Sequence, residues 1–266
     1  MPQPWNPSPF VKFSLLTHAA AGASLLVVPG SWPWALAAIA ANQGALITAG
    51  LLPRTTLLGP NLTRLPAAAT KRREIALTID DGPDPEVTPH VLDQLDAAGA
   101  KASFFCIGHI ARRHPALCRE IVARGHRVEN HGDSHSSLFA AFGSRRMTAD
   151  IAAAQATLCD LTGEAPRFFR PTAGLRNPLL DPVLARLGLQ LAAWTRRPFD
   201  TREGQPQIVF DRLTRQLAAG DILLMHDGHA ARTATGEPVI LAVLPRLLQT
   251  LAEHRLTPVT LASAQP

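Results

Sequence analysis

The segment from Glu74 to Pro83 reads EIALTIDDGP, and it decides the fold. Its first part, Ile75–Ile79, is a short apolar run of the kind that forms a buried strand, and the Asp-Asp-Gly-Pro after it is a typical loop sequence. Similar apolar runs follow along the chain, separated by segments with helical spacing. Strands that alternate with helices form a parallel sheet covered by helices, which is either a closed barrel or an open doubly wound sheet.

This alternation continues to the end of the chain and predicts an α/β fold. The later strands are predicted at 102–107, 126–129, 167–170, 189–194, 221–225 and 258–261. The helices are predicted at 87–98, in a segment that ends at Gly125, and at 147–161, 180–187, 207–219 and 239–253. Glycine follows several of these helices, as is common where a helix ends.

Polar side chains follow the ends of five predicted strands. They are Asp80 and Asp81, His131 and His135, Arg170, the segment after Trp194, and His226 with Asp227. In a β/α barrel, the rim formed by the carboxyl ends of the strands carries the active site. We therefore expect these residues to meet at one site.

Part of this set predicts a catalytic metal site. His131 and His135 are four residues apart, which suits two ligands of one cation, and neutral imidazole is a common zinc ligand. One carboxylate of the Asp80-Asp81 pair can bind the metal while its neighbour acts as a base. Three protein ligands leave positions for water and substrate. Each pattern alone also has a simpler interpretation, a solvated turn for Asp-Gly-Pro and a coincidental spacing for the histidines.

Five motifs in sequence order resemble those of the polysaccharide deacetylase family, carbohydrate esterase family 4, with its NodB-like deacetylase domain. They are Thr78–Pro83, Gly125–His135, Arg170–Gly174, Trp194–Asp200 and Leu224–Asp227. The resemblance extends from Glu74 to the end of the chain. It implies a distorted β/α barrel and a metal-dependent hydrolase that removes the N-acetyl group, less often an O-acetyl group, from a sugar in a glycan.

The same resemblance implies the roles of individual residues. Asp80 is the implied general base, and His226 the implied general acid. Arg170 would hold Asp80, and Asp200 would orient His226. In amide hydrolysis the base takes a proton from water as it attacks, and the acid protonates the departing nitrogen.

The implied metal ligands are Asp81, His131 and His135, and the expected metal is one divalent ion, Zn²⁺. The implied substrate-binding residues are Leu224 in the acetyl pocket, Ala173 through its backbone N–H, and Trp194.

Three positions depart from the family pattern and affect the expected substrate. Thr172 and Ala173 replace a proline and an aromatic residue, and Thr201 replaces a tryptophan. Aromatic walls give a sugar-binding groove stacking surface. Their loss predicts a groove of different shape, and with a membrane segment it suggests a lipid-linked or otherwise membrane-associated amino sugar as the substrate.

Residues 1–56 are predicted to form an apolar helical hairpin that inserts into a membrane. Its two apolar runs, Phe13–Val28 and Trp34–Leu52, approach the roughly 20 residues that a spanning helix needs. A cleaved signal sequence and apolar helices packed on the domain are alternative interpretations. Residues 57–73 are predicted to be a linker, and residues 74–266 a polysaccharide deacetylase-like catalytic domain.

Cations flank this hairpin on both sides and predict its orientation. Lys12 precedes it, and Arg54, Arg64 and the cations at 71–73 follow it. Because positively charged flanks stay in the cytoplasm, we expect the catalytic domain on the cytoplasmic side of a bacterial inner membrane.

Composition excludes several other classes of protein. The net charge is +5, but the arginines are scattered and the sequence has no Tyr, so we expect no nucleic-acid partner. Three cysteines cannot form a paired disulfide framework. The alternative functions that remain are a metal-dependent amidase for a non-sugar amide and a non-catalytic, membrane-tethered glycan-binding protein.

Overall fold

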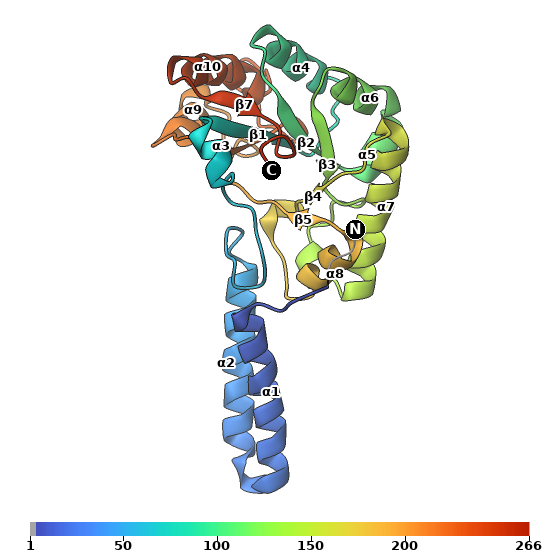
Figure 1. Cartoon of the computed structure of the whole chain (residues 1–266), viewed down its shortest axis with the longest axis vertical. Helices are drawn as coiled ribbons and strands as arrows, with labels where there is room; N and C mark the ends of the chain where they lie inside the picture. The colour runs from blue at the N-terminus through green and yellow to red at the C-terminus, as the bar shows by residue number, and fades with distance from the viewer. Residues whose placement is uncertain (1–3, 266) are drawn as a thin grey trace.

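The strands form one parallel sheet that curls around an interior, in a computed structural model that describes residues 4–265 (Figure 1). They are β1 (Glu74–Asp80), β2 (Ala102–Cys106), β3 (Arg127–Asn130), β4 (Phe168–Phe169), β5 (Gln190–Leu191), β6 (Ile222–His226) and β7 (Thr257–Val259). Their order is β5-β4-β3-β2-β1-β6, and β7 pairs with the beginning of β1. The edges are joined by one bridge, between Arg196 and Leu223, so the predicted distorted β/α barrel is confirmed.

Helices cover the outer face of the sheet (Figure 1). They are α4 (Thr88–Ala97), α5 (Gly108–Arg113), α6 (Pro115–Ala123), α7 (Ser144–Thr162), α8 (Leu180–Leu187), α9 (Pro206–Thr214) and α10 (Val239–Glu253). Along β1, Ile75, Leu77 and Ile79 belong to the cluster that packs against the helices, whereas Ala76 belongs to a second cluster. Because alternate residues of a strand face opposite sides, β1 is buried on both faces, which explains its continuous apolar run.

Two details differ from the sequence prediction. β4 and β5 have two residues each, within longer predicted strands. The helix predicted to end at Gly125 is in fact two helices, α5 and α6. The break falls at Pro115, which cannot donate a backbone hydrogen bond to the preceding turn and instead begins α6.

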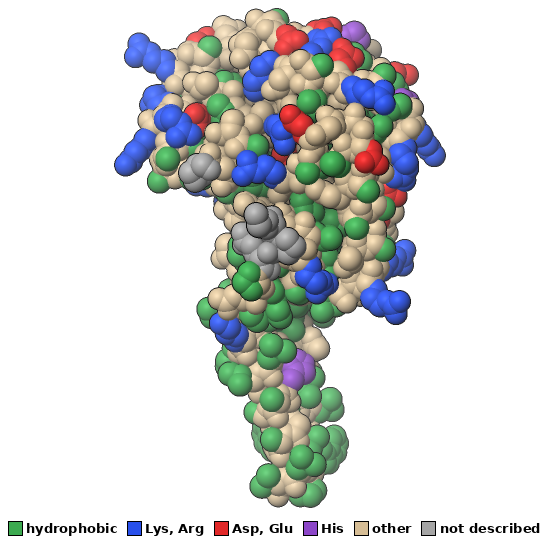
Figure 2. Space-filling view, turned by 45° about the vertical axis from the view of Figure 1, so that its right-hand side comes forward, with side chains coloured by type: hydrophobic (Ala, Val, Ile, Leu, Met, Phe, Trp, Pro, Cys, Tyr) green, Lys and Arg blue, Asp and Glu red, His purple; other side chains and the backbone are tan. Residues whose placement is uncertain are grey.

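The predicted N-terminal helical hairpin is confirmed, and it projects from the α/β domain (Figure 1). It comprises α1 (Pro9–Val27), the short 3₁₀ turn Pro29–Ser31 and α2 (Trp32–Gly50). Among the described residues, α1 is the one helix long and apolar enough to cross a membrane, as a membrane anchor or a signal peptide would be. Figure 2 shows that hydrophobic side chains dominate the hairpin and that charges lie mostly on the α/β domain.

The polar residues of the hairpin pair with one another. Asn42, buried in α2, donates a hydrogen bond to Ser14 Oγ of α1 over 2.8 Å and lies 3.4 Å from Nδ1 of His18. Large apolar side chains point outward instead, including Leu16 at 68% exposure and Leu26 at 87% exposure. The hairpin therefore pairs its buried polar side chains, Ser14 and Asn42, internally and presents a largely apolar surface.

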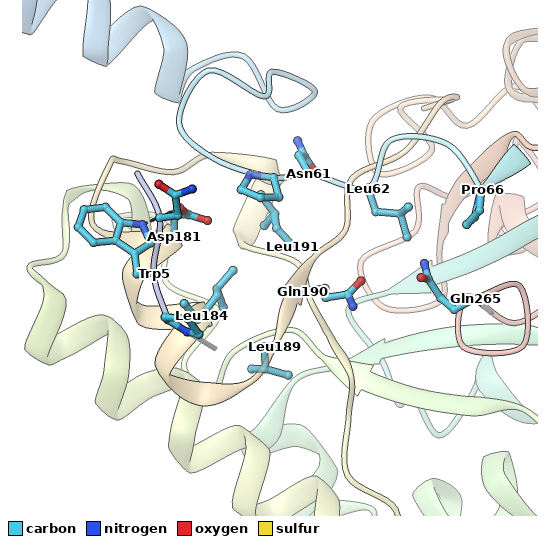
Figure 3. A pocket seen from close by; sticks show the side chains of 14 residues that line it. Trp5, Asn61, Leu62, Pro66, Asp181, Leu184, Leu189, Gln190, Leu191 and Gln265 are labelled. Carbon is cyan, nitrogen blue, oxygen red and sulfur yellow. Dashed lines mark hydrogen bonds between the residues drawn. The ribbon is translucent and has the colours of Figure 1, made fainter. Parts of the chain in front are cut away.

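Hydrogen bonds join the base of the hairpin to the α/β domain. Trp5, before α1, donates from Nε1 to Asp181 of α8 over 2.8 Å, beside a hollow of about 530 Å³ that lies apart from the motif residues (Figure 3). Arg176 donates its backbone N–H to the carbonyl of Gly50 over 3.2 Å. Residues 57–73, predicted as a linker, include the helix α3 (Ala67–Lys71) and the buried Leu65.

Candidate active site

A pocket of about 280 Å³ opens at the carboxyl ends of the strands, where eight of the ten predicted site residues line it. These eight are Asp80, Asp81, His131, His135, Ala173, Trp194, Leu224 and His226. The other two, Arg170 and Asp200, are buried and hydrogen-bond to members of this set. The structure thus brings together residues that are up to 146 positions apart in the chain, from Asp80 to His226.

Asp80, at the end of β1, forms a buried ion pair with Arg170. Arg170 Nη1 lies 2.5 Å from Asp80 Oδ1 and also donates to Thr78 Oγ1 over 3.0 Å. Its other nitrogens donate to the carbonyls of Ala192 and Ala193. Because each of its three nitrogens donates a hydrogen bond, the guanidinium is fixed and holds the Asp80 carboxylate in one orientation.

Asp81 faces a different set of partners from its neighbour. Its Oδ1 lies 3.1 Å from Nε2 of His131 and 3.0 Å from Nε2 of His135. Its backbone φ is 76°, in the left-handed region, which turns the chain at the end of β1. Burial alone would raise the pKa of Asp81, but hydrogen bonds from His131 and His135 hold it well below its usual range.

These three side chains could hold one metal ion. Their ligand atoms all lie within 4.8 Å of one another. His131 Nδ1 lies 2.7 Å from the carbonyl oxygen of Arg170, and since a carbonyl only accepts, Nδ1 carries the proton and Nε2 is left as the ligand atom. One carboxylate and two imidazoles, with space beside them, are a donor set that suits zinc.

His226, at the end of β6, is held by Asp200. Nδ1 of His226 donates to Asp200 Oδ1 over 2.8 Å, and its backbone N–H donates to Oδ2 over 2.8 Å. Burial lowers the pKa of His226, but the Asp200 carboxylate outweighs burial and raises it to about 9. Asp200 thus favours the protonated ring, and because Nδ1 faces Asp200, Nε2 is the nitrogen left for the pocket.

The loop after β4 brings Ala173 to the pocket in a strained conformation. Ala173 has φ 56° and lies in the 3₁₀ turn Thr172–Gly174. Gly174 has φ 76°, and a Cβ there would lie 2.5 Å from the Trp194 ring and 2.7 Å from Pro53. Strained residues of this kind cluster at functional sites.

His229 and Arg197 are among the side chains that reach the pocket without a predicted role. His229 stacks on His135 with ring centres 6.0 Å apart, and its Nδ1 lies 3.3 Å from Asp81 Oδ2. Arg197 also lines the pocket. Arg197 lies within the Trp194–Asp200 motif, and His229 lies two residues after the Leu224–Asp227 motif. This proximity is the only signal for them in the sequence.

Comparisons with known proteins agree with this geometry. The polysaccharide deacetylase family model matches residues 67–192. The peptidoglycan-N-acetylglucosamine deacetylase of Bacillus cereus is 34% identical over 176 residues, which are 65% of this chain and 81% of that protein. The chitooligosaccharide deacetylase of Sinorhizobium fredii is 33% identical over 168 residues, or 63% of this chain and 78% of that protein.

Solved structures are also similar to this one. The Bc1960 peptidoglycan N-acetylglucosamine deacetylase superposes with a TM-score of 0.67 at 28% identity, over 77% of this chain and 92% of that chain. The family 4 carbohydrate esterase from Streptomyces lividans, in complex with acetate, gives a TM-score of 0.63 at 31% identity, over 70% of this chain and 91% of that chain. With the curled parallel sheet and the shared motifs, these matches show that the chain belongs to the polysaccharide deacetylase family, a group of glycan deacetylases.

Proposed function

We propose that this protein is a metal-dependent hydrolase that removes the N-acetyl group from an amino sugar. One observation carries the proposal: a single pocket holds a carboxylate–imidazole metal set, a separate carboxylate paired with Arg170, and a histidine paired with Asp200. Acetamide hydrolysis needs an activated water, a stabilised oxyanion and a proton donor, and this pocket offers a group for each.

The residues divide these tasks between them. Asp81, His131 and His135 would hold the zinc ion, which when bound would supply Lewis acidity toward the acetyl carbonyl and the attacking water. Asp80 accepts the proton of the attacking water. His226 gives its Nε2 proton to the departing sugar nitrogen. The backbone N–H of Ala173 donates to the developing oxyanion, and Leu224 packs against the acetyl methyl group.

The test is acetate release by the purified full chain from a panel of N-acetylated sugars. We expect release that a chelator abolishes and that added Zn²⁺ restores. If the metal-loaded, folded protein releases acetate from none of them but hydrolyses a non-sugar acetamide, the sugar assignment is wrong and the enzyme is an amidase of another kind.

We also propose that the hairpin α1–α2 anchors the enzyme in a membrane. At 1.5 Å per residue, the 19 residues of α1 span about 28 Å, close to the roughly 30 Å of a bilayer's hydrocarbon core. The internal Asn42–Ser14 hydrogen bond and the apolar outer surface support insertion of the two helices together. A hairpin enters and leaves on the same side, so the catalytic domain lies close to the lipid surface.

We also propose that the catalytic domain faces the cytoplasm. Lys12, in the first turn of α1, and Arg54, after α2, support a cytoplasmic catalytic domain, under the rule that cationic flanks stay inside. A protease added to intact spheroplasts should then leave the domain uncut, whereas permeabilised cells should lose it. Cleavage in intact spheroplasts would place the domain outside.

The membrane position and the small residues Ala173 and Thr201 support a membrane-associated substrate, such as a lipid-linked amino sugar. Both line the pocket where the family pattern has bulky aromatic residues. Faster deacetylation of soluble chitooligomers than of lipid-linked sugars would contradict this preference.

A further inference from the structure

A second and larger hollow, the hairpin-base groove, adjoins the active-site pocket. Its volume is about 1060 Å³, and it is lined by Leu51–Thr55, directly after α2, and by residues from the loop after β5 and from α9. Five residues line both the groove and the pocket: Ala173, Trp194, Arg197, Thr201 and Arg202. A single ligand can therefore occupy both hollows at once.

The groove is strongly cationic. Its lining includes six arginines and, among the described residues 4–265, no Asp or Glu. Arg196 pairs with Asp221, and Arg212 lies 3.6 Å from Glu203. Four arginines have no ion-pair partner within the part of the chain that the structure describes, namely Arg54, Arg197, Arg202 and Arg215. Such a concentration of unpaired positive charge attracts an anion.

Arg197 is the most informative of these arginines. Its guanidinium lies 5.1 Å from the ring centre of Trp194 and 5.0 Å from that of Phe199, and its buried Nε has no hydrogen-bond partner among residues 4–265. Burial lowers the pKa of Arg197, against the opposing effect of Asp80. A half-buried guanidinium without an acceptor is costly, and an anion bound in the groove would supply one.

The other wall of the groove is apolar. Leu51 and Leu52 follow α2 and are 57% and 52% exposed. If the hairpin is inserted, this wall lies at the level where lipid headgroups meet hydrocarbon. A ligand that fits the groove is therefore an anion joined to an apolar chain.

We propose that the hairpin-base groove binds the phosphate or diphosphate that joins an N-acetylated sugar to its membrane lipid. The inference rests on the proposed deacetylase function and names the substrate class of that site. The sugar enters the active-site pocket through the opening beside Ala173 and Thr201, the phosphate contacts Arg197 and Arg202, and the lipid chain leaves along Leu51 and Leu52 toward the bilayer.

The first experiment measures binding without catalysis. The full chain is placed in phosphatidylcholine nanodiscs, treated with a chelator so that the metal site cannot bind phosphate, and titrated with farnesyl diphosphate or farnesol. We expect the diphosphate to bind at least tenfold more tightly. Charged hydrogen bonds of this kind predict roughly a tenfold loss of diphosphate affinity in Arg197→Gln and in Arg202→Gln.

The matched control is Arg119→Gln, an exposed arginine on α6 far from the groove in sequence. It should bind the diphosphate as the unmodified protein does. Equal affinity for diphosphate and alcohol, or an equal loss in the control, would overturn the proposal. Displacement of the diphosphate by phosphatidylglycerol with comparable affinity would also overturn it, because the groove would then be a site for bulk anionic lipid.

The second experiment separates this inference from the proposed function. The metal-loaded full chain is given farnesyl-diphosphate-linked N-acetylglucosamine and octyl N-acetylglucosaminide, which lacks phosphate. We expect a kcat/KM ratio of at least ten in favour of the diphosphate, falling toward one in Arg202→Gln. Equal kcat/KM in the unmodified protein refutes the phosphate site but leaves the deacetylase function standing. Acetate from neither substrate, with diphosphate binding intact, counts against the deacetylase function on this class of sugar.

Discussion

Asp80 and Asp81 are adjacent in the chain yet face different partners. Asp80 contacts Arg170 over 2.5 Å, and Asp81 contacts the two imidazoles at 3.0 and 3.1 Å. Adjacent side chains of a strand point to opposite faces, and the left-handed φ of Asp81 ends this alternation, so both carboxylates line one pocket while each keeps its own partners. Neighbouring carboxylates can therefore take two chemical roles.

This separation predicts different defects for the two variants. Asp80→Asn should lower kcat by roughly 10²–10⁴-fold, the range for loss of a general base, while zinc content stays near one per chain. Asp81→Asn should lose zinc itself. Acetate release and metal analysis of the dialysed proteins check both. Asp93→Asn, an exposed carboxylate on α4, is the matched control; loss of zinc in Asp80→Asn would show that the assignment is reversed.

A second prediction concerns the pH dependence set by Asp200. The pKa of His226 is raised to about 9, so the acid form is present below that pH and is lost as the pH rises through it. In Asp200→Asn the opposing effect of burial remains, and the pKa falls. The alkaline limb of kcat/KM should move at least one unit to lower pH.

Zinc adds positive charge and lowers the pKa of His226 in both proteins, so the difference between them is the quantity to measure. Profiles of kcat/KM from pH 6 to 10 are compared at equal zinc loading. An alkaline limb that does not move would exclude His226, as held by Asp200, as the general acid.

The identity of the site residues was predictable from the sequence, and several of their contacts were not. Five motifs at strand ends predicted ten residues that the structure brings to one site. Two loops bring His229 and Arg197 to that site, and the backbone of His229 has a left-handed φ of 57°. Loop conformation depends on contacts with distant segments of the chain, and the spacing of motifs carries no information about those contacts.

At the scale of elements, the alternation of short apolar runs with helical patterns predicted the order of strands and helices but not their lengths. β4 and β5 are two residues each, because the chain turns away to form the site loop at Thr172–Gly174 and the bridge to β6 at Arg196. Pro115 divides one predicted helix into two. The ends of elements follow from local backbone chemistry and tertiary packing together.

The turn that carries Ala173 gives an element-scale prediction. Gly174→Ala should lower the melting temperature and the activity, because a Cβ there would overlap Trp194 and Pro53 as well as strain a residue at φ 76°. Gly163→Ala is the control, since its φ is 72° but nothing lies within 4 Å of a Cβ. The Gly163→Ala variant should therefore lose only the stability that the left-handed backbone costs a non-glycine residue, roughly 1–2 kcal/mol.

Thermal unfolding and acetate release of the two variants measure the difference. A melting temperature several degrees lower in Gly174→Ala than in Gly163→Ala, with activity lost only in the former, is expected. Equal melting temperatures and equal activities would mean that the turn tolerates displacement and that Ala173 does not need its observed position.

At the scale of the whole molecule, charge and apolar surface are segregated. The first 70 residues contain no Asp or Glu, and all 21 acids lie in the rest of the chain. The sequence predicted this division, but not that the hairpin base would help to form a groove beside the active site. That groove joins Leu51–Thr55 to residues more than 110 positions later, a contact that exists only after folding.

Membrane anchoring gives the last prediction. An arginine near the middle of a spanning helix costs about 2.5–3.5 kcal/mol on insertion scales, so Leu16→Arg, which is on the outer surface of α1, should shift much of the protein out of the membrane fraction. Leu138→Arg is the matched control, because Leu138 is equally exposed, at 67%, but lies on the catalytic domain. Fractionation after alkaline carbonate washing measures both. If Leu16→Arg stays membrane-bound and Leu138→Arg is released, the contact with lipid runs through the catalytic domain; if both leave the membrane equally, the effect is one of folding. Release of Leu16→Arg alone, with its acetate release from a soluble glycoside retained, is the outcome expected of an anchor that positions a folded enzyme at the lipid surface.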